Sequence, residues 1–461
     1  MWEEETISAI ATAAGEGAIG IIRMSGNRAI EIVDKIFSEI NLKKAEEIES
    51  QKMSYGYIIN PEDGKKIDEV LVLIMRAPRS YTREDVVEIH CHGGVVSLKN
   101  ILELTIKYGA RLGEPGEFTK RAFLNGRLDL AQAEAVIDII RAKTDASLRM
   151  ALGQLGGALS EKIRTMRHKI LGMIANLEAS IDFPEEDIEE LTAQEVKVGI
   201  TPVLEEIRHL LATKETGRIL RDGLETVIIG KPNVGKSSLL NALLKEKRAI
   251  VTDVPGTTRD SIEEFVNIGG IPLKIIDTAG IRETEDIVEK IGVEKTREFI
   301  ASADLILVLL DASLPLSAED KEVLQLLPGR EAVVLINKSD LPSCLDNNEL
   351  ASYVPNPKIL KISVLEGQGL EELEQMIVDM VYSGQVQQKE GAFIHNLRQA
   401  DLLEQAKKHL LSVIVTIDNN MPPDCIVVDL RDAWDKLGEV TGDTVGENII
   451  DQIFTNFCIG K

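Results

Sequence analysis

The sequence predicts a multi-domain protein that combines an α+β domain, an all-helical domain and an inserted α/β domain. Residues 226–229 form a short apolar run that leads directly into a glycine-rich loop, which is the order of a buried strand followed by a helix N-terminus. Residues 131–179 and 192–213 before that segment, and 396–415 after it, carry apolar residues at helical spacing. Residues 1–119 instead alternate short apolar runs with few helical stretches, and this pattern predicts the α+β domain.

Composition limits the class of protein. The 461 residues are expected to form roughly three domains, and the formal net charge of −24 argues against a broad nucleic-acid-binding surface. An RNA partner would have to be contacted through a local basic patch or a basic companion protein. The cysteines at 91, 344, 425 and 458 have no C-x-x-C spacing, so neither a disulfide framework nor a cysteine zinc site is indicated. No apolar run reaches the roughly 18 residues of a membrane helix and the acidic N-terminus is no signal peptide, so we expect a cytoplasmic protein with no membrane partner.

The loop after residues 226–229 is a phosphate-binding motif. Gly230-Lys-Pro-Asn-Val-Gly-Lys-Ser237 matches G-x-x-x-x-G-K-[ST] in the strand-then-helix context that supports the motif. Glycines let backbone N–H groups wrap the phosphates, and the following helix offers its positive N-terminal end. We expect Lys236 to act in catalysis by reaching the β- and γ-phosphates, and the Ser237 hydroxyl to bind Mg²⁺.

Three later motifs extend this segment to a Ras-like GTP-binding domain. Asp277-Thr-Ala-Gly280 can hold Mg²⁺ through water and sense the γ-phosphate. Asn337-Lys-Ser-Asp340 ends in a carboxylate that can accept two hydrogen bonds from guanine, which adenine cannot supply. Ser363 precedes a loop able to cover the base, and the order of the motifs resembles the translation-factor class of GTPases. The GTP-binding residues predicted from these motifs are Asn233, Val234, Gly235, Lys236, Ser237, Ser238, Asp277, Thr278, Ala279, Gly280, Asn337, Lys338, Asp340 and Ser363.

Two segments near the N-terminus resemble ligand-binding motifs. Gly15-Glu-Gly-Ala-Ile-Gly20 matches the dinucleotide fingerprint, but residues 21–25 have strand character where that fingerprint needs a helix. A glycine-rich hairpin after a strand at residues 6–14 is therefore favoured. His90 and His92 would share one face of a strand. A zinc site needs more ligands than these, so a structural strand end is favoured over a metal site. Residues 29–40 have helical spacing, and 70–75 and 85–90 have strand character.

The change of character at residues 113–118 predicts a domain boundary. We expect an N-terminal domain at residues 1–119, a helical domain built from 120–219 and 385–461, and a GTP-binding domain at 220–384. A nucleotide domain flanked by two helical halves indicates an insertion, because the flanking helices can then close on each other.

Several segments together resemble one known family. They are Ile21-Ile-Arg23, Glu88-Ile-His-Cys-His-Gly-Gly94, the block from Gly113 to Leu130, the nucleotide motifs and the terminal Cys458-Ile-Gly-Lys461. The chain resembles the TrmE-type family of bacterial and organellar tRNA modification GTPases from end to end. The resemblance implies an N-terminal domain similar to the folate-binding fold of aminomethyltransferases, which also forms a homodimer.

The resemblance also implies a reaction. With a flavin-dependent partner, MnmG, members add an aminomethyl or carboxymethylaminomethyl group to C5 of the wobble uridine of certain tRNAs. The tRNA could be met mainly through the partner. A tetrahydrofolate derivative, in the 5-formyl or 5,10-methylene form, supplies the added carbon. The implied folate-binding residues are Arg23, Glu88, Arg127 and Lys461; Arg127 stands where many members have Lys, which keeps the charge but changes the geometry.

The resemblance assigns further roles around the nucleotide. Ile281 follows the Asp-Thr-Ala-Gly motif where Ras-like proteins carry a water-orienting Gln, and the family implies that Glu289 takes this part. A potassium ion would be held by the Asn233 side chain and the carbonyls of Thr252, Val254 and Thr257, and Thr258 would bind Mg²⁺. Pro255 replaces an Ala found in some members. The implied switch residues in contact with GTP are Thr252, Asp253, Val254, Pro255, Gly256, Thr257 and Thr258.

Some alternatives remain open at this level. Cys458 is either a buried, inert residue of an apolar helix or a functional thiol near the folate. A ribosome-assembly GTPase is a second hypothesis, although no basic RNA-binding module is evident in the sequence. A membrane-remodelling GTPase is a third, although no Lys/Arg-rich amphipathic helix is evident.

Overall fold

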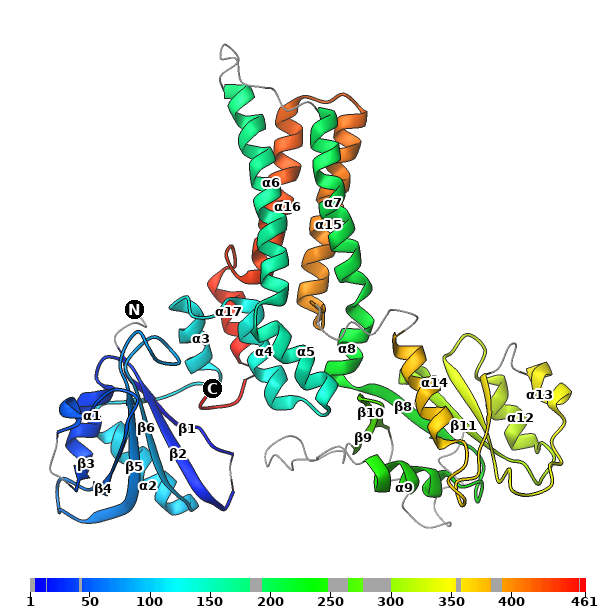
Figure 1. The fold of residues 1–461 in the computed structure, drawn as a ribbon, viewed down its shortest axis with the longest axis horizontal. Coiled ribbons are helices and arrows are strands. Elements are labelled where there is room, and N and C mark those ends of the chain that lie inside the picture. The colour runs from blue at the N-terminus through cyan, green and yellow to red at the C-terminus, as the bar shows by residue number, and fades with distance from the viewer. Residues whose placement is uncertain are drawn as a thin grey trace.

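The chain has three parts (Figure 1): a sheet with helices at the N-terminal end, a central bundle of long helices, and a second sheet with helices formed by the middle of the chain. This computed structural model describes residues 5–13, 15–40, 44–182, 193–247, 264–276, 300–353, 358–382, 392–455 and 457–461. The predicted fold class, with α+β, helical and α/β parts, is confirmed. No helix in these ranges is long and apolar enough to cross a membrane.

The N-terminal part is a seven-stranded sheet in the order β3-β4-β5-β6-β2-β1-β7. Neighbouring strands are antiparallel except β1 and β7. Alternate residues of β5, such as Val70, Val72 and Ile74, are buried, because period-2 alternation places them on one face, under the two helices. The elements are β1 (Ile7–Ile10), β2 (Gly17–Ser25), β3 (Phe37–Glu39), β4 (Met53–Ile59), β5 (Lys66–Met75), β6 (Val86–Gly93), β7 (Arg111–Leu112), the short 3₁₀ helix η1 (Ala45–Glu47), α1 (Ala29–Ile36) and α2 (Val95–Lys107).

Two expectations for this part are corrected in detail. The helix predicted over 29–40 ends at Ile36, and Phe37–Glu39 forms the edge strand β3 paired with β4. Pairing with β4 and burial of Phe37 outweigh the helical spacing there, as tertiary context often does. The glycine-rich hairpin is confirmed, because β1 and β2 pair antiparallel. The preceding strand is shorter than predicted and begins at Ile7 and ends at Ile10.

The central part is a bundle of four long helices, seen side by side in Figure 1. They are α6 (Ala158–Asp182), α7 (Ala193–Ala212), α15 (Leu397–Asp418) and α16 (Pro423–Thr441). Helices from both sides of the nucleotide segment share one apolar core. The stripe predicted on α7, with Val196, Ile200 and Val203 among its members, is buried in that core.

Shorter helices join the bundle to its neighbours. They are α3 (Glu117–Leu124), α4 (Leu130–Arg141), α5 (Asp145–Leu155), α8 (Lys214–Asp222) and α17 (Glu447–Phe454). Phe454 and Phe457 pack with Leu130 and Ile137 of α4. The residues after α17 also reach the N-terminal sheet, where the carbonyl of Gly460 accepts from Arg23 of β2 (Figure 1).

The middle of the chain folds into a six-stranded sheet in the order β13-β12-β11-β8-β10-β9. Only β9 is antiparallel to its neighbour. Every residue of β11 is buried, as expected for a strand of a parallel sheet covered on both faces. The elements are β8 (Leu224–Ile229), β9 (Glu264–Ile268), β10 (Ile271–Ile275), β11 (Leu305–Asp311), β12 (Ala332–Asn337), β13 (Lys358–Lys361), α9 (Lys236–Lys247), α12 (Ala318–Gln325), α13 (Asn347–Tyr353) and α14 (Leu370–Tyr382).

The two connections between the bundle and this sheet meet at one buried carboxylate. Asp138 of α4 lies 2.8 Å from Nε of Arg221, on the outgoing connection, and 2.8 Å from Nε2 of His395, on the returning one. Burial alone would raise the pKa of Asp138, but the His395 and Arg221 side chains outweigh burial and lower it. The carboxylate therefore holds both connections as an anion. The exact domain limits at residues 119, 219 and 384 stay a prediction.

Candidate functional site

The phosphate loop lies between β8 and α9, as the motif predicts. Gly230, Asn233 and Gly235 all have positive φ, at 150°, 64° and 105°. A Cβ atom on Gly235 would lie 2.4 Å from Nδ2 of Asn337, so only glycine allows the loop to approach that side chain. Ser237 and Ser238 are exposed in the first turn of α9. They lie at a helix N-terminus exposed to solvent, the environment that favours a bound phosphate.

Lys236 is held inside the loop by backbone carbonyls. Its Nζ donates to the carbonyl oxygens of Gly230, at 2.7 Å, and Lys231, at 2.9 Å. An ammonium group has three protons, so one remains for a phosphate oxygen. Burial lowers the pKa of Lys236, and a bound polyphosphate would offset that effect by favouring the charged form.

Asn337 connects three loops of the nucleotide domain. Its Nδ2 donates to the carbonyl of Val234 in the phosphate loop, at 2.7 Å. Its Oδ1 accepts from the backbone N–H of Val364 at 3.1 Å, in the loop after Ser363. The side chain is buried. Asn337 therefore fixes the position of the guanine-recognition loops relative to the phosphate loop.

Asp340 is oriented by the predicted serine loop. Its Oδ1 accepts from Oγ of Ser363 at 2.6 Å, so the carboxylate is directed before any base binds. Lys338, with φ of 61°, places Nζ 2.6 Å from Oδ2 of Asp311 at the end of β11. Burial raises the pKa of Asp311, but the Lys338 and Ser313 hydrogen bonds outweigh burial and lower it. The structure thus brings the predicted residues Asn337, Lys338, Asp340 and Ser363 together at one edge of the sheet.

Other predicted nucleotide residues lie outside the described residues. These are the switch residues Thr252, Asp253, Val254, Pro255, Gly256, Thr257 and Thr258, the residues Asp277, Thr278, Ala279 and Gly280, and the catalytic candidate Glu289. Ser237 is therefore the described part of the predicted Mg²⁺ donor set, and Asn233 the described part of the predicted K⁺ donor set.

A second site lies on the N-terminal sheet, around an ion pair. Arg23 of β2 and Glu88 of β6 are register partners, and Nε of Arg23 lies 2.8 Å from Oε1 of Glu88. Nη1 of Arg23 also donates to the carbonyl of Gly460 at 3.0 Å. Both charged side chains are largely buried, with 15% and 13% of their surfaces exposed. The strands thus bring together two residues that the family resemblance assigns to one site.

Aromatic rings complete the walls of this second site. The Arg127 guanidinium lies 4.6 Å from the centre of the Tyr81 ring, and its Nη1 donates to the Tyr81 carbonyl at 3.1 Å. The Arg23 guanidinium lies 5.7 Å from the same ring and 5.8 Å from that of Phe118. Guanidinium groups attract anionic groups, and aromatic rings offer flat faces on which another ring can pack. Arg23, Glu88, Arg127 and the chain end are therefore grouped in space as the sequence predicts.

The C-terminal residues close the site from one side. Gly460 has φ of 85°, and a Cβ atom there would lie 2.4 Å from the carbonyl of Ile10. The carbonyl of Cys458 accepts from the backbone N–H of Gly116 at 3.2 Å. Burial and the nearby Arg23 guanidinium lower the pKa of the Lys461 side chain. The terminal residues are thus docked on the N-terminal part.

Cys458 is exposed, and this corrects the interpretation of it as a buried residue of an apolar helix. Helix α17 ends at Phe454, so Cys458 lies beyond the helix in which that interpretation placed it. The thiol is accessible to solvent next to the docked chain end.

The His90 and His92 side chains each lie beside a carboxylate, and only that of His92 is hydrogen-bonded to it. Nδ1 of His92 lies 2.6 Å from Oδ1 of Asp68, and Nε2 of His90 lies 3.4 Å from Oε2 of Glu88. Cys91 is buried on the opposite face, as the alternation of a strand requires. The hydrogen bond that the His92 ring donates to the Asp68 carboxylate raises the pKa of His92. These pairs support the interpretation of the segment as a strand end.

Comparison with known proteins identifies the family. Residues 6–127 match the family model described as GTP-binding protein TrmE N-terminus, and residues 130–458 match that of the MnmE helical domain. The tRNA modification GTPase MnmE of Alkaliphilus metalliredigens is 52% identical over 461 residues, covering 100% of both chains. That of Clostridioides difficile is 53% identical over 461 residues, again covering 100% of both chains. The chain belongs to the MnmE family of tRNA modification GTPases.

A solved structure offers a weaker likeness. The G domain of the T. maritima FeoB iron transporter is 25% identical and covers 34% of this chain and 97% of its own, with a TM-score of 0.24. A TM-score of that size carries no conclusion about the fold of this MnmE-family protein.

Asp311, Tyr81 and Phe118 belong to these sites although no sequence motif predicts them as site residues. Asp311 ends the fully apolar run of β11, and a lone acid at the carboxyl end of such a strand is a signal that could have identified it. Tyr81 lies in the loop between β5 and β6, where no spacing rule marks it. Its part in the site depends on the way the sheet brings this loop beside Arg127.

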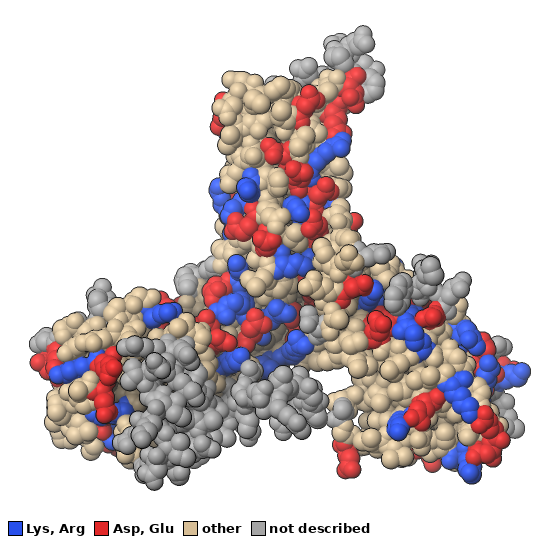
Figure 2. Space-filling model, turned by 180° about the vertical axis from the view of Figure 1, so that it is seen from behind, with Lys and Arg blue, Asp and Glu red and all other residues tan. Residues whose placement is uncertain are grey.

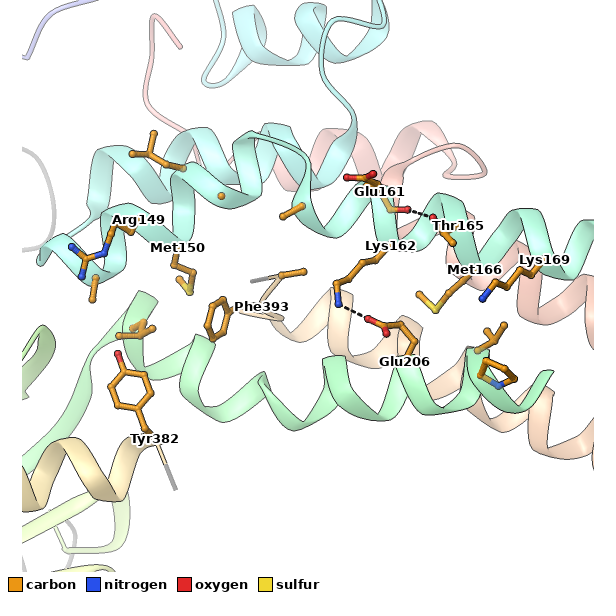
Figure 3. Close-up of a pocket in the computed structure, with 18 of the residues that line it drawn as sticks. Arg149, Met150, Glu161, Lys162, Thr165, Met166, Lys169, Glu206, Tyr382 and Phe393 are labelled. Carbon is orange, nitrogen blue, oxygen red and sulfur yellow. Dashed lines mark hydrogen bonds and ion pairs between the residues drawn. The ribbon is translucent and has the colours of Figure 1, made fainter. Parts of the chain in front are cut away.

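A large cavity in this MnmE-family protein lies apart from both groups of predicted residues. It has a volume of about 1490 Å³ and is lined by α5, α6, α7 and residues near the nucleotide domain. Figure 3 shows Met150 and Phe393 at one end and the ion pair of Lys162 with Glu206 farther along. None of the sequence-predicted site residues lines it, so neither proposed ligand is assigned to it.

Proposed function

We propose that this protein is a GTP hydrolase that modifies C5 of the wobble uridine of certain tRNAs. It would add an aminomethyl or carboxymethylaminomethyl group together with a flavin-dependent partner, MnmG. The tRNA substrate follows from membership of the MnmE family, whose relatives carry the name tRNA modification GTPase. The observation that carries the nucleotide part is the grouping of Lys236, Asn337 and Asp340 around one edge of a parallel sheet.

Guanine selection rests on a directed carboxylate. Asp340 already accepts from Ser363, which leaves its other oxygen and remaining lone pairs for the two donors of guanine. A base without that donor pair would leave a carboxylate unsatisfied, which costs binding free energy. Lys236 would bind the β- and γ-phosphates, and Ser237 with Thr258 would hold Mg²⁺.

Hydrolysis is proposed to depend on residues outside the described ones. Glu289 would orient the attacking water, and K⁺ would bind at Asn233 with the carbonyls of Thr252, Val254 and Thr257. The left-handed φ of 64° at Asn233 supports part of this, since it fixes the direction of a side chain that carries an amide oxygen. The cation would supply positive charge near the bridge between the β- and γ-phosphates, where negative charge develops.

The second site fits a reduced folate by its chemistry. Arg23, Arg127 and Lys461 supply positive charge, and Tyr81 and Phe118 supply flat apolar surface. Glu88 offers carboxylate oxygens to N–H donors such as those of a pterin ring. A tetrahydrofolate derivative, in the 5-formyl or 5,10-methylene form, would bring the one-carbon unit, while these side chains bind and orient it. The exposed thiol of Cys458 lies on the docked chain end beside this site.

A homodimer is proposed through the N-terminal sheet. The face opposite α1 and α2 carries exposed Ile19, Met53, Tyr55 and Leu71, with 63%, 50%, 42% and 41% of each residue exposed. Met53 pairs with Leu73, which pairs with Glu88, so this apolar strip adjoins the second site. Exposed apolar strips of this kind commonly mark protein interfaces. A second copy on this face would shield both the strip and the site from water.

The tRNA is proposed to meet a limited basic surface. In Figure 2, acidic and basic side chains are interspersed over the visible face, and basic ones gather near the base of the helical bundle. The net charge of −24 would repel the phosphates of tRNA over most of the surface. The tRNA is therefore proposed to contact a local basic patch, or to bind mainly through the partner protein. The proposed reaction places the protein in the cytoplasm.

Reconstitution tests this function. The purified protein, the flavoprotein partner, unmodified tRNA, GTP, an amine donor and a methylene or formyl tetrahydrofolate should yield modified wobble uridine, detected by mass spectrometry of nucleosides. Omission of GTP or of the folate should stop the modification. Normal modification without this protein would refute the proposal.

A further inference from the structure

Lys231, the second residue of the phosphate loop, lies against a buried carboxylate behind the loop. Its Nζ is 2.9 Å from Oδ2 of Asp320, and the two side chains are 15% and 3% exposed. Asp320 belongs to the first turn of α12. The pair therefore links the phosphate loop to the helix that follows β11, away from the place where phosphates would bind.

The contacts of Asp320 are unevenly shared between its two oxygens. Oδ2 accepts from the backbone N–H of Ser317, at 3.0 Å, and from its hydroxyl, at 2.8 Å. The Ser317 hydroxyl oxygen in turn accepts from the backbone N–H of Asp320 at 3.2 Å, which completes the cap of α12. Among the described residues, Oδ1 is buried and has no hydrogen-bond partner. Burying an ion pair commonly costs as much free energy as it returns. A buried pair with one unsatisfied oxygen is therefore poorly explained by stability alone.

The same lysine also touches the catalytic side chain through its backbone. The carbonyl of Lys231 accepts from Nζ of Lys236 at 2.9 Å. Asp320 thus fixes the side chain of Lys231, and the backbone of Lys231 fixes the ammonium of Lys236. We propose that Asp320, acting through Lys231, is a positioning residue that aims Lys236 at the nucleotide phosphates. This inference rests on the proposed GTP-hydrolysing function and extends it.

The loop needs such an anchor because its glycines leave it free to turn. Gly230 and Gly235 both have positive φ, and glycine loses more conformational entropy on ordering than any other residue. Two protons of the Lys236 ammonium are directed to the carbonyls of Gly230 and Lys231, so these carbonyls decide where the third proton points. If the Lys231 peptide rotated, the third proton would leave the direction of the β- and γ-phosphates.

Three variants of the full chain separate positioning from stability. Lys231→Met removes the ion pair and keeps the cap of α12, whereas the matched control Ser317→Ala removes the hydroxyl cap and keeps the ion pair. The double variant Lys231→Met with Asp320→Asn removes the buried pair without leaving a lone charge. Mg²⁺–GTP and Mg²⁺–GDP affinities are measured by calorimetry, kcat/KM for GTP by phosphate release, and Tm by thermal unfolding.

We expect Lys231→Met to lower kcat/KM by roughly tenfold to a hundredfold, the usual range for a small misplacement of a catalytic group. Affinity should fall more for GTP than for GDP, since Lys236 also reaches the γ-phosphate. Ser317→Ala should lower Tm and leave both affinities unchanged. The double variant should regain Tm relative to Lys231→Met, because no unpaired charge remains buried, yet keep the low kcat/KM. Lys231→Arg, which preserves the charge, should restore most of the activity.

Different results would refute the proposed function and the positioning role. Failure of the parent protein to bind GTP would refute the proposed function itself. A parent that hydrolyses GTP, with Lys231→Met equally active, would overturn the positioning role alone. Recovery of kcat/KM together with Tm in the double variant would also overturn it, because the pair would then be merely structural.

Discussion

Arg23 bonds both Glu88 on the neighbouring strand and, through Nη1, the carbonyl of Gly460 at 3.0 Å. Arg23 and Gly460 are 437 positions apart in the chain. One guanidinium thus holds both the sheet side and the chain-end side of the second site. Glu88 satisfies part of the buried charge of Arg23, and the backbone carbonyl satisfies another part. The site is therefore assembled only when the C-terminal residues are docked.

This arrangement predicts that folate binding depends on Arg23 and Arg127 and is independent of GTP. Arg23→Ala or Arg127→Ala should weaken binding of a reduced folate by roughly tenfold or more, because a hydrogen bond to a charged group contributes about 1.5–3 kcal/mol. GTP affinity should stay unchanged, since these residues lie on the other sheet. Calorimetry with 5-formyltetrahydrofolate measures the effect. Arg28→Ala is the control, because Arg28 pairs with Glu31 on α1 and is exposed; a parent protein that binds no folate would refute the one-carbon part of the account.

A second prediction concerns the choice of base. Asp340→Asn should weaken GTP binding by on the order of 100-fold, because an amide cannot accept from N1–H and the 2-amino group as a carboxylate does. The same variant should bind xanthosine triphosphate better than the parent does. Competition titrations with both nucleotides provide the measurement. The control Asp346→Asn changes an acid six positions along the chain and should leave both affinities alone, and equal GTP affinity in Asp340→Asn and the parent would contradict the assigned role.

A third prediction concerns potassium. GTP hydrolysis by the full chain should be faster in K⁺ than in Na⁺ at matched ionic strength, since a K⁺ ion at Asn233 would stabilise charge developing between the phosphates. Asn233→Gly should abolish the difference, because it removes the amide oxygen while glycine tolerates the left-handed φ of 64°. Asn233→Ala should abolish it as well, with some added backbone strain. Phosphate release in the two salts measures this, and equal rates for the parent would defeat the proposal.

A fourth prediction concerns the junction at Asp138. The folded-state pKa of Asp138 lies below its ordinary value of 3.8, so its contribution to stability is full above that value and is lost as the pH falls through the folded-state pKa. At pH 7, Asp138→Asn should destabilise the protein by roughly 3–5 kcal/mol, because the half-buried Arg221 and the buried His395 lose the carboxylate between them. The control is Asp222→Asn, an exposed acid 3.9 Å from the same arginine, which should have little effect.

The measurement is the difference in Tm between parent and variant across pH. The difference should be several degrees at pH 7 and should shrink as the pH falls below about 4. A difference that stays constant down to pH 2, or none at pH 7, would show that the Asp138 carboxylate does not hold the two connections.

Much of the fold follows from local patterns, and the remainder depends on contacts between distant segments. Strand β11 follows from an apolar run and the loop before α9 from its glycine spacing, and both are visible in the sequence. Phe37 shows the limit, because its helical spacing gives way to pairing with β4. A tertiary contact of this kind has no local signal.

The site residues likewise fall into those predicted by local motifs and those placed by contacts between distant segments. Lys236 and Asp340 belong to compact motifs whose spacing carries the chemistry, so the sequence predicts them directly. Tyr81 contacts Arg127, 46 positions away, and Asp320 contacts Lys231, 89 positions away. Contacts between such distant positions are seen only in the folded chain. The exposure of Cys458 is also not predictable from the sequence, because apolar neighbours along the chain do not decide whether the thiol is buried.

We propose that this protein modifies wobble uridines in tRNA in a GTP-dependent manner. The most direct measurement is mass spectrometry of tRNA nucleosides from cells that lack the protein and are complemented with the parent or with Lys236→Ala. We expect the aminomethyl-type C5 modifications to disappear in the deletion, to return with the parent, and to stay absent with Lys236→Ala. An unchanged nucleoside profile in the deletion would contradict the account.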